Sequence, residues 1–134
     1  NHMRILAMGG GENGRPGTLY EIKKFDEEIV KMTGKKNPKF LFVAFTQKSA
    51  EGAEAYYNVI KRNFSELGCE CEHLREKDLQ DMNVVNKKIT EANIIYVGGG
   101  NTLRLMNILR KYKKTFLSKG KLVYILYQFS KVFI

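Results

Sequence analysis

Short apolar runs alternate with segments of helical periodicity along the chain, and this order is the feature that most restricts its fold. The apolar runs are too short for core helices and are typical of buried strands. Strands that are separated by helices form βαβ units, in which helices cover both faces of a parallel sheet. The sequence therefore predicts one α/β domain with a mainly parallel sheet between two helical layers. The predicted strands are 4–8, 40–45, 69–74, 94–97 and 121–127.

The segments between these runs predict four helices. In the first, apolar residues recur every three or four positions, and Gly34 ends the pattern. The predicted buried face of that helix consists of Leu19, Ile22, Phe25, Ile29 and Met32. The remaining predicted helices are 51–67, which Gly68 ends, 84–92 and 103–112.

The size and charge of the chain restrict its class. Its 134 residues suit a single domain, 4–134, behind Asn1-His2-Met3, which resembles a tag remnant and a start methionine. The net charge is +9, but the lysines are spread along the chain without an interleaved aromatic ribbon. This pattern favours solvated helix faces and disfavours nucleic-acid binding. No apolar run is long enough to cross a bilayer.

Two thiols and one imidazole lie close together in the third predicted strand. Cys69, Cys71 and His73 alternate and therefore point to one face, which could serve a soft metal or a thiol–imidazole pair. Zinc sites have wider ligand spacing, so we expect inward-packed cysteines with Glu70 and Glu72 in water, and no metal. Cysteines this close along one strand cannot form a disulfide that stabilises the fold. Two free thiols therefore predict a reducing, cytoplasmic location.

Two triple-glycine segments each follow a predicted strand directly. They are Gly9-Gly10-Gly11 and Gly98-Gly99-Gly100, and parallel sheets bind ligands beyond the carboxyl ends of their strands. We expect both segments at one site. The first begins a G-x-G-x-x-G pattern, but no helix opens after it, and the second strand ends in Ala44-Phe45-Thr46 without an acid. We therefore expect no dinucleotide, and we predict that Gly9, Gly10, Gly11 and Thr46 line the site.

The second glycine segment has the sharper chemistry. Glycine lets a ligand approach the backbone closely, and Asn101 is a suitable N-cap for the predicted helix that follows. A helix start offers free N–H groups and a positive dipole end. The segment is therefore suited to a phosphate, a carboxylate or the oxyanion of an acyl-transfer intermediate. A tight turn without a ligand would have the same composition, so this reading stays open.

The residues around these glycines resemble the peptidase E family, serine peptidases that include aspartyl dipeptidase and are related to cyanophycinase. The segment Ile95-Tyr-Val-Gly-Gly-Gly-Asn-Thr-Leu103 is similar to the family's signature. Further similar segments are 3–11, 27–39, 40–44 and 64–70. The resemblance implies a flavodoxin-like three-layer α/β/α sandwich, like that of class I glutamine amidotransferases.

The resemblance also implies an activity. Family members use a Ser–His pair with an acidic third member, and the Ser lies on a G-x-S-A-G elbow after the strand that follows the GGGN helix. The implied chemistry is hydrolysis of peptides with an N-terminal Asp, without a metal or an organic cofactor. By resemblance, Gly99 and Gly100 donate N–H groups to the oxyanion, and Asn101 lines the substrate site.

The chain departs from the family pattern after Gly120. No G-x-S-A-G follows, Ser130 is flanked by Phe129 and Lys131, and no histidine follows His73. The ending resembles a truncated or frame-shifted copy, so we expect a sheet that is incomplete on its C-terminal side and a chain that is inactive alone. An apolar edge strand at 121–127 would then pair with a second copy. The alternatives are a module that binds small anions or peptides through the GGGN loop, and a basic interaction protein.

Overall fold

The computed structural model describes residues 4–8, 13–44, 49–98, 107, 110–111 and 122–126, with the backbone alone for 4–8 and 122–126. Strands and helices alternate as the sequence predicts. In chain order the elements are β1 (Arg4–Met8), α1 (Lys23–Met32), β2 (Lys39–Val43), α2 (Ala50–Glu66), β3 (Glu70–Leu74), the 3-10 helix η1 (Glu76–Gln80), α3 (Met82–Glu91), β4 (Ile94–Val97) and β5 (Leu122–Leu126). Of the predicted helix 103–112, the structure describes only residues 107, 110 and 111, which are helical.

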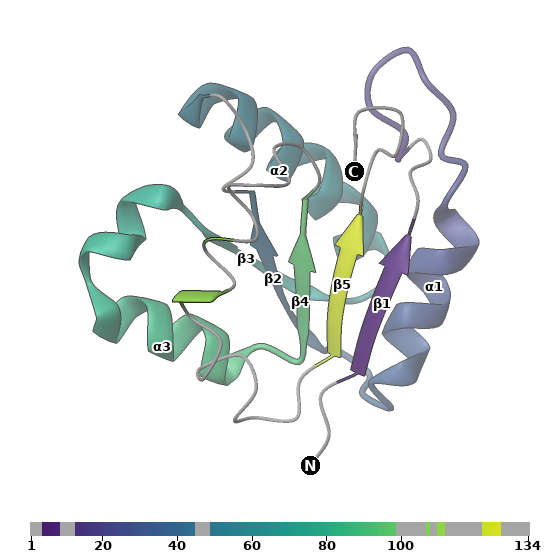
Figure 1. The fold of residues 1–134 in the computed structure, drawn as a ribbon. Coiled ribbons are helices and arrows are strands. Elements are labelled where there is room, and N and C mark those ends of the chain that lie inside the picture. Colours follow the sequence, from purple (N-terminus) through teal and green to yellow (C-terminus); the bar gives the residue numbers. More distant parts are fainter. Residues whose placement is uncertain are drawn as a thin grey trace.

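The five strands form one parallel sheet in the order β1-β5-β4-β2-β3. Helices α1 and α2 cover one face of the sheet, and α3 lies against the other (Figure 1). This arrangement confirms the predicted flavodoxin-like α/β/α sandwich. All strands point the same way, so their carboxyl ends meet at one edge, which we call the carboxyl edge.

Strand β5 lies inside the sheet. It pairs with β1 on one side, from Arg4 opposite Leu122 to Met8 opposite Leu126, and with β4 on the other. The expectation of an exposed edge strand at 121–127 is therefore wrong, because the chain returns and places β5 between β1 and β4. The edges of the described sheet are β1 and β3. The homodimer through a C-terminal edge strand loses this premise, and self-association stays a prediction.

Strand β2 carries the centre of the core. Phe40 and Phe42 point to α1 and α2, whereas Leu41 and Val43 point to the other face, and all four are buried. Two-sided burial explains why this strand is apolar throughout. The ring of Phe40 stacks on Phe64 of α2 at a centroid distance of 4.1 Å. The sheet and α2 are therefore joined by aromatic packing.

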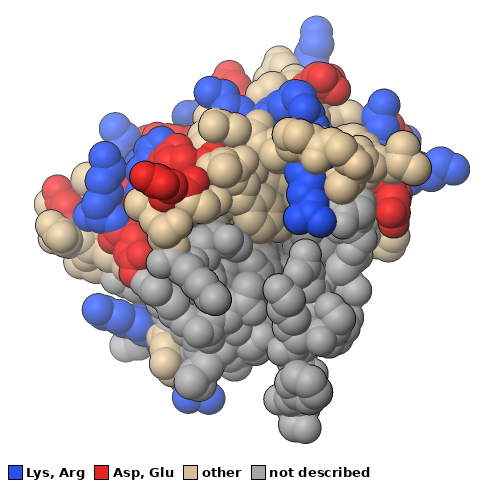
Figure 2. Space-filling view, turned by 90° about the horizontal axis from the view of Figure 1, so that it is seen from above, with Lys and Arg blue, Asp and Glu red and all other residues tan. Residues whose placement is uncertain are grey.

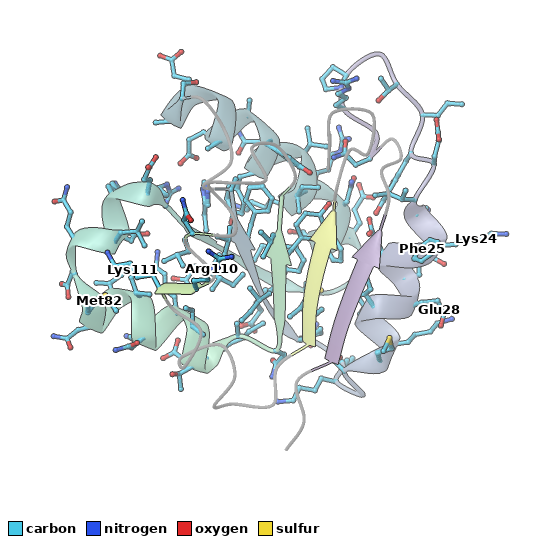
Figure 3. The ribbon with its side chains drawn as sticks, in the orientation of Figure 1. Lys24, Phe25, Glu28, Met82, Arg110 and Lys111 are labelled. Carbon is cyan, nitrogen blue, oxygen red and sulfur yellow. The ribbon has the colours of Figure 1, made fainter. Side chains whose placement is uncertain are left out.

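The buried face of α1 differs from the predicted one. Leu19 precedes the helix and is 80% exposed, and Phe25 is 57% exposed on the face that points away from the sheet (Figure 3). Ile22, Asp26 and Ile29 face the core instead. The predicted helical spacing is confirmed, but the buried position that the prediction gave to Phe25 is occupied by Asp26.

Glycines end the first two helices as predicted. Gly34 and Gly68 have φ angles of 65° and 91°, a left-handed conformation that side chains disfavour. Within the described residues, no helix is both long and apolar enough to span a bilayer.

Candidate functional site at the carboxyl edge

Both glycine segments begin at the carboxyl edge. Met8, which ends β1, and Val97, which ends β4, flank the same strand, β5. Two strand spacings place these ends about 10 Å apart. The fold therefore brings the starts of the two segments to one edge. All seven residues predicted to hold the oxyanion or line the site lie outside the described residues: Gly9, Gly10, Gly11, Thr46, Gly99, Gly100 and Asn101.

Gly98 shows how the chain leaves β4. Its N–H donates to the carbonyl of Val43, 2.8 Å away, at the end of β2. A Cβ atom on Gly98 would lie 3.1 Å from Cε2 of Tyr56 and 3.4 Å from Cζ of Phe42. A side chain there would press on the Tyr56 ring, which would have to shift by a few tenths of an ångström, so close packing favours glycine at this position.

The chain that follows the first glycine segment is tied to α2. The side-chain amide of Asn63, which is buried, donates to the carbonyl of Asn13 at 2.7 Å, and Arg62 donates to the carbonyl of Gly14. Asn13 also forms an antiparallel bridge with Tyr20. Helix α2 thus anchors this loop and, through Tyr56, contacts the start of the second glycine segment.

A buried carboxyl lies beneath this loop. The hydroxyl of Tyr20 donates to Oδ2 of Asp26, whereas Oδ1 is buried without a hydrogen-bond partner among the described residues. Burial raises the pKa of Asp26 to about 7, although the Tyr20 hydrogen bond opposes this rise. Sequence patterning missed this group, because a charged residue in a helix predicts an exposed position.

A second polar group forms where β3 ends. Nδ1 of His73 lies 3.4 Å from Oε1 of Glu54 but makes no hydrogen bond with any described residue, and Glu54 forms an ion pair with Arg75. The Arg75 hydrogen bond lowers the pKa of Glu54. Both members of this ion pair are partly exposed, so it contributes at most about 1 kcal/mol to stability.

The same group continues onto α3. Nζ of Lys88 donates to the carbonyl of His73 at 2.8 Å and forms an ion pair with Asp78 at 3.2 Å. The backbone N–H of Arg75 also donates to Asp78. This network fixes the turn after β3. The sequence signal for it was weak, because its members come from four different segments.

His73 is a buried, neutral imidazole. Its ring stacks on Tyr57 at 4.5 Å and lies 5.3 Å from Phe42. Burial, aided by the charge of Arg75, lowers its pKa to about 4. A base that is enclosed in this way is not placed to take a proton from a substrate at the carboxyl edge.

We predict that His73 stays neutral in the folded protein down to about pH 4. The unfolded chain takes up this proton near pH 6.5, so this group should lower the stability as the pH falls from 6.5 towards 4. A proton NMR titration of the ring, assigned with His73→Gln, measures this directly. A midpoint at or above 6.5 in the folded protein would contradict the assignment.

The two cysteines pack inward, as predicted. Cys69 is buried and Cys71 is half-buried on the α2 side, both are free thiols, and Glu70 and Glu72 are exposed. Burial raises the pKa of Cys69 to about 12, so its reactive thiolate is suppressed. Among the described residues no three His, Cys, Asp or Glu side chains are close enough to hold a metal ion.

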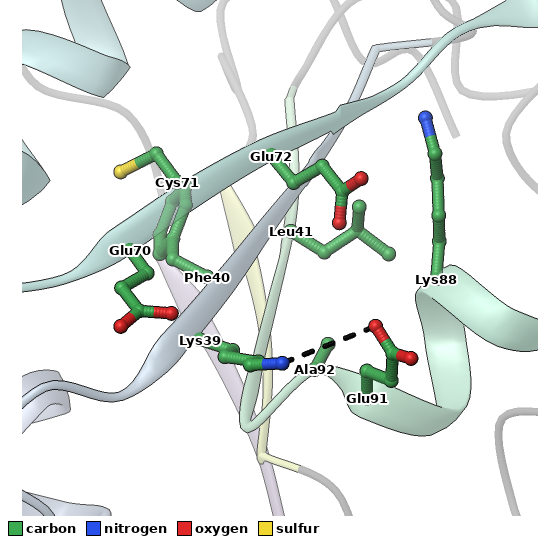
Figure 4. A pocket seen from close by; sticks show the side chains of 9 residues that line it. All are labelled: Lys39, Phe40, Leu41, Glu70, Cys71, Glu72, Lys88, Glu91 and Ala92. Carbon is green, nitrogen blue, oxygen red and sulfur yellow. Dashed lines mark ion pairs between the residues drawn. The ribbon is translucent and has the colours of Figure 1, made fainter.

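A cavity of about 260 Å³ lies between β2, β3 and α3 (Figure 4). Lys39 forms an ion pair with Glu91 across it at 4.0 Å. Lys39 and Glu70 begin their strands, so the cavity opens towards the amino ends of the strands and away from the carboxyl edge. It is therefore separate from the candidate site.

Seen from above the carboxyl edge, acidic side chains are interspersed with lysines and arginines around the margin of the molecule (Figure 2). Over the part of this face that the structure describes, the positive charge forms no continuous stripe. This distribution agrees with the prediction that the +9 charge is spread over solvated surfaces.

Comparison with known proteins adds the family to this fold. A crystal structure of a peptidase from an acI-B1 Actinobacterium is similar, with a TM-score of 0.70 and 18% sequence identity over 93% of this chain and 54% of that one. At this identity the likeness shows a shared fold, and this chain spans about half the length of that peptidase. A comparison with curated proteins found no match.

The sequence model of peptidase family S51 matches residues 5–118. The chain therefore belongs to peptidase family S51, which confirms the resemblance to the peptidase E family. The match includes both glycine segments and ends before β5.

Proposed function

We propose that this chain carries the anion-holding part of a serine-type dipeptidase site and that these 134 residues do not hydrolyse peptides on their own. The observation that carries the proposal is the exit of Gly98 from β4 at the carboxyl edge, in a member of a peptidase family. In this role the N–H groups of Gly99 and Gly100 hold the oxyanion, and Asn101 lines the site. The substrate class is a dipeptide with an N-terminal Asp.

The chemistry explains why an anion site alone is not a catalyst. Acyl transfer needs a nucleophile that is activated by a base, as well as donors for the oxyanion. The sequence contains no G-x-S-A-G elbow, and Ser130 lacks the neighbouring glycines that such an elbow needs. His73 is buried and neutral beside Tyr57. Donors without these partners leave little hydrolysis to expect.

The same glycine exit supports a second candidate function, a binding module for small anions or acidic peptides. A bare backbone at the carboxyl edge of a parallel sheet suits a phosphate or a carboxylate, whether or not hydrolysis follows. We further propose a cytoplasmic location, which the two free thiols support because they would stay reduced there.

Binding of Asp-Leu should be saturable and should depend on the glycine segment. Because Gly99→Val blocks the close approach of a ligand to the backbone, we expect it to abolish the binding heat in isothermal titration calorimetry. Phe25→Val is the control, since Phe25 is 57% exposed on the outer face of α1 and lies outside both glycine segments. Equal affinity of the wild type and Gly99→Val would contradict the proposal. Inorganic phosphate as a second ligand separates the two candidates, because a general anion module binds it as well as the dipeptide.

A further inference from the structure

Helix α2 reaches the point where the second glycine segment begins, and it does so through one ring. Cε2 and Cζ of Tyr56 would lie 3.1 and 3.4 Å from a Cβ atom on Gly98, so the ring packs against the bare backbone of that glycine. In addition, the N–H of Gly98 donates to the carbonyl of Val43 at 2.8 Å. Where the chain leaves β4, Gly98 therefore contacts both β2 and the Tyr56 ring.

We infer that Tyr56 is a positioning residue for the anion site: its ring fixes the direction in which the chain leaves β4 at Gly98. This inference rests on the proposed function, which gives the residues after Gly98 the task of holding an anion. Backbone donors stabilise an oxyanion only when they lie at hydrogen-bond distance from it. A displacement of about 1 Å can reduce the rate of a reaction roughly a hundredfold, and we expect binding to depend on the same alignment.

The Tyr56 ring is itself held by the core. It packs on Phe42 with a centroid distance of 5.1 Å and an interplanar angle of 55°, and Phe42 is fully buried. Its helix begins close by at Ser49, whose hydroxyl accepts the N–H of Gly52 at 3.0 Å. A half-buried ring on a capped helix, packed against a buried one, is a rigid support.

The neighbouring tyrosine has a different task, which makes it a matched control. Tyr57 turns towards β3, where its ring stacks on His73 at 4.5 Å. Adjacent rings on one helix thus support two different strand ends. A change at Tyr57 disturbs the same helix and, through Phe42, the same core, but it leaves the Tyr56 ring in place against Gly98.

The inference is tested by the amide resonance of Gly98 and by Asp-Leu affinity in Tyr56 variants. Tyr56→Phe keeps the ring carbons that touch Gly98, so it should keep the wild-type resonance and affinity. Tyr56→Ala, and Tyr56→Leu if the alanine variant does not fold, should shift the Gly98 resonance, speed its hydrogen exchange and weaken binding about tenfold or more. Tyr57→Leu should leave the Gly98 resonance in place.

An unmoved Gly98 resonance in the Tyr56→Ala or Tyr56→Leu protein would overturn the inference. So would an equal shift in Tyr57→Leu, because it would show general loosening of α2. If the wild type binds neither Asp-Leu nor inorganic phosphate, the proposed function fails, and the hydrogen exchange of the Gly98 amide decides whether Tyr56 holds the chain, because removal of an aromatic ring can shift a nearby resonance by itself.

Discussion

Replacement of Phe42 by alanine should lower the free energy of unfolding by about 3–5 kcal/mol, the cost of removing a fully buried aromatic ring from a core. The Phe42 side chain has no exposed surface. It joins the sheet to α2 and packs against rings on β3 and β4. Its ring neighbours are Tyr56, Tyr57, His73 and Tyr96. Urea denaturation followed by circular dichroism measures the loss.

Phe25→Ala is the matched control for this prediction. The chemical change is the same, but Phe25 is 57% exposed on the outer face of α1, so we expect a change within about 0.5 kcal/mol. Losses of similar size in the two variants would contradict the placement of Phe42 at the centre of the core.

Asp26→Asn should stabilise the protein at alkaline pH. The pKa of Asp26 is about 7 in the folded protein and near 3.8 in the unfolded chain. Between these values the folded state holds the extra proton, so this group lowers the stability as the pH rises. The full difference corresponds to about 4 kcal/mol above pH 7. An asparagine oxygen can still accept the Tyr20 hydroxyl but carries no charge at any pH.

The measurement is the free energy of unfolding of both proteins in urea at several pH values from 4 to 8. The advantage of the variant over the wild type should grow with pH by up to about 4 kcal/mol. Taking the difference cancels the opposite contribution of His73, which the two proteins share. A constant difference across this range would mean that Asp26 is not a buried acid.

Local patterns predicted which elements form, because each strand is apolar and short and each helix has its own periodicity. The strand 94–97 was predicted to the residue, and the alternation of Cys69, Cys71 and His73 against Glu70 and Glu72 correctly gave the two faces around β3. These features depend on neighbours in the sequence. A single chain shows them without further information.

The position of β5 in the sheet could not be predicted from local sequence patterns. Strand order depends on which strands pair, and Leu122–Leu126 is apolar whether it lies at an edge or between β1 and β4. The family resemblance supplied the fold class but left this insertion open.

The candidate site was predictable only in part. Two glycine segments after strands indicated the carboxyl edge, but the support from Tyr56 depends on the approach of α2 to β4. Asp26 was missed because its burial is a tertiary effect that overrides its polarity. Arg75 and Glu54, separated by twenty-one positions, meet only through the β2–α2–β3 unit.

We propose that this chain holds a dipeptide at the carboxyl edge without hydrolysing it. The most direct test incubates Asp-Leu with a stoichiometric amount of the protein, after a cooperative melt has shown that it is folded, and follows free leucine by chromatography. We expect no more release than with Gly99→Val. Release above that level, and its loss in Ser130→Ala, would show that the chain holds its own nucleophile and would contradict the proposed lack of hydrolysis.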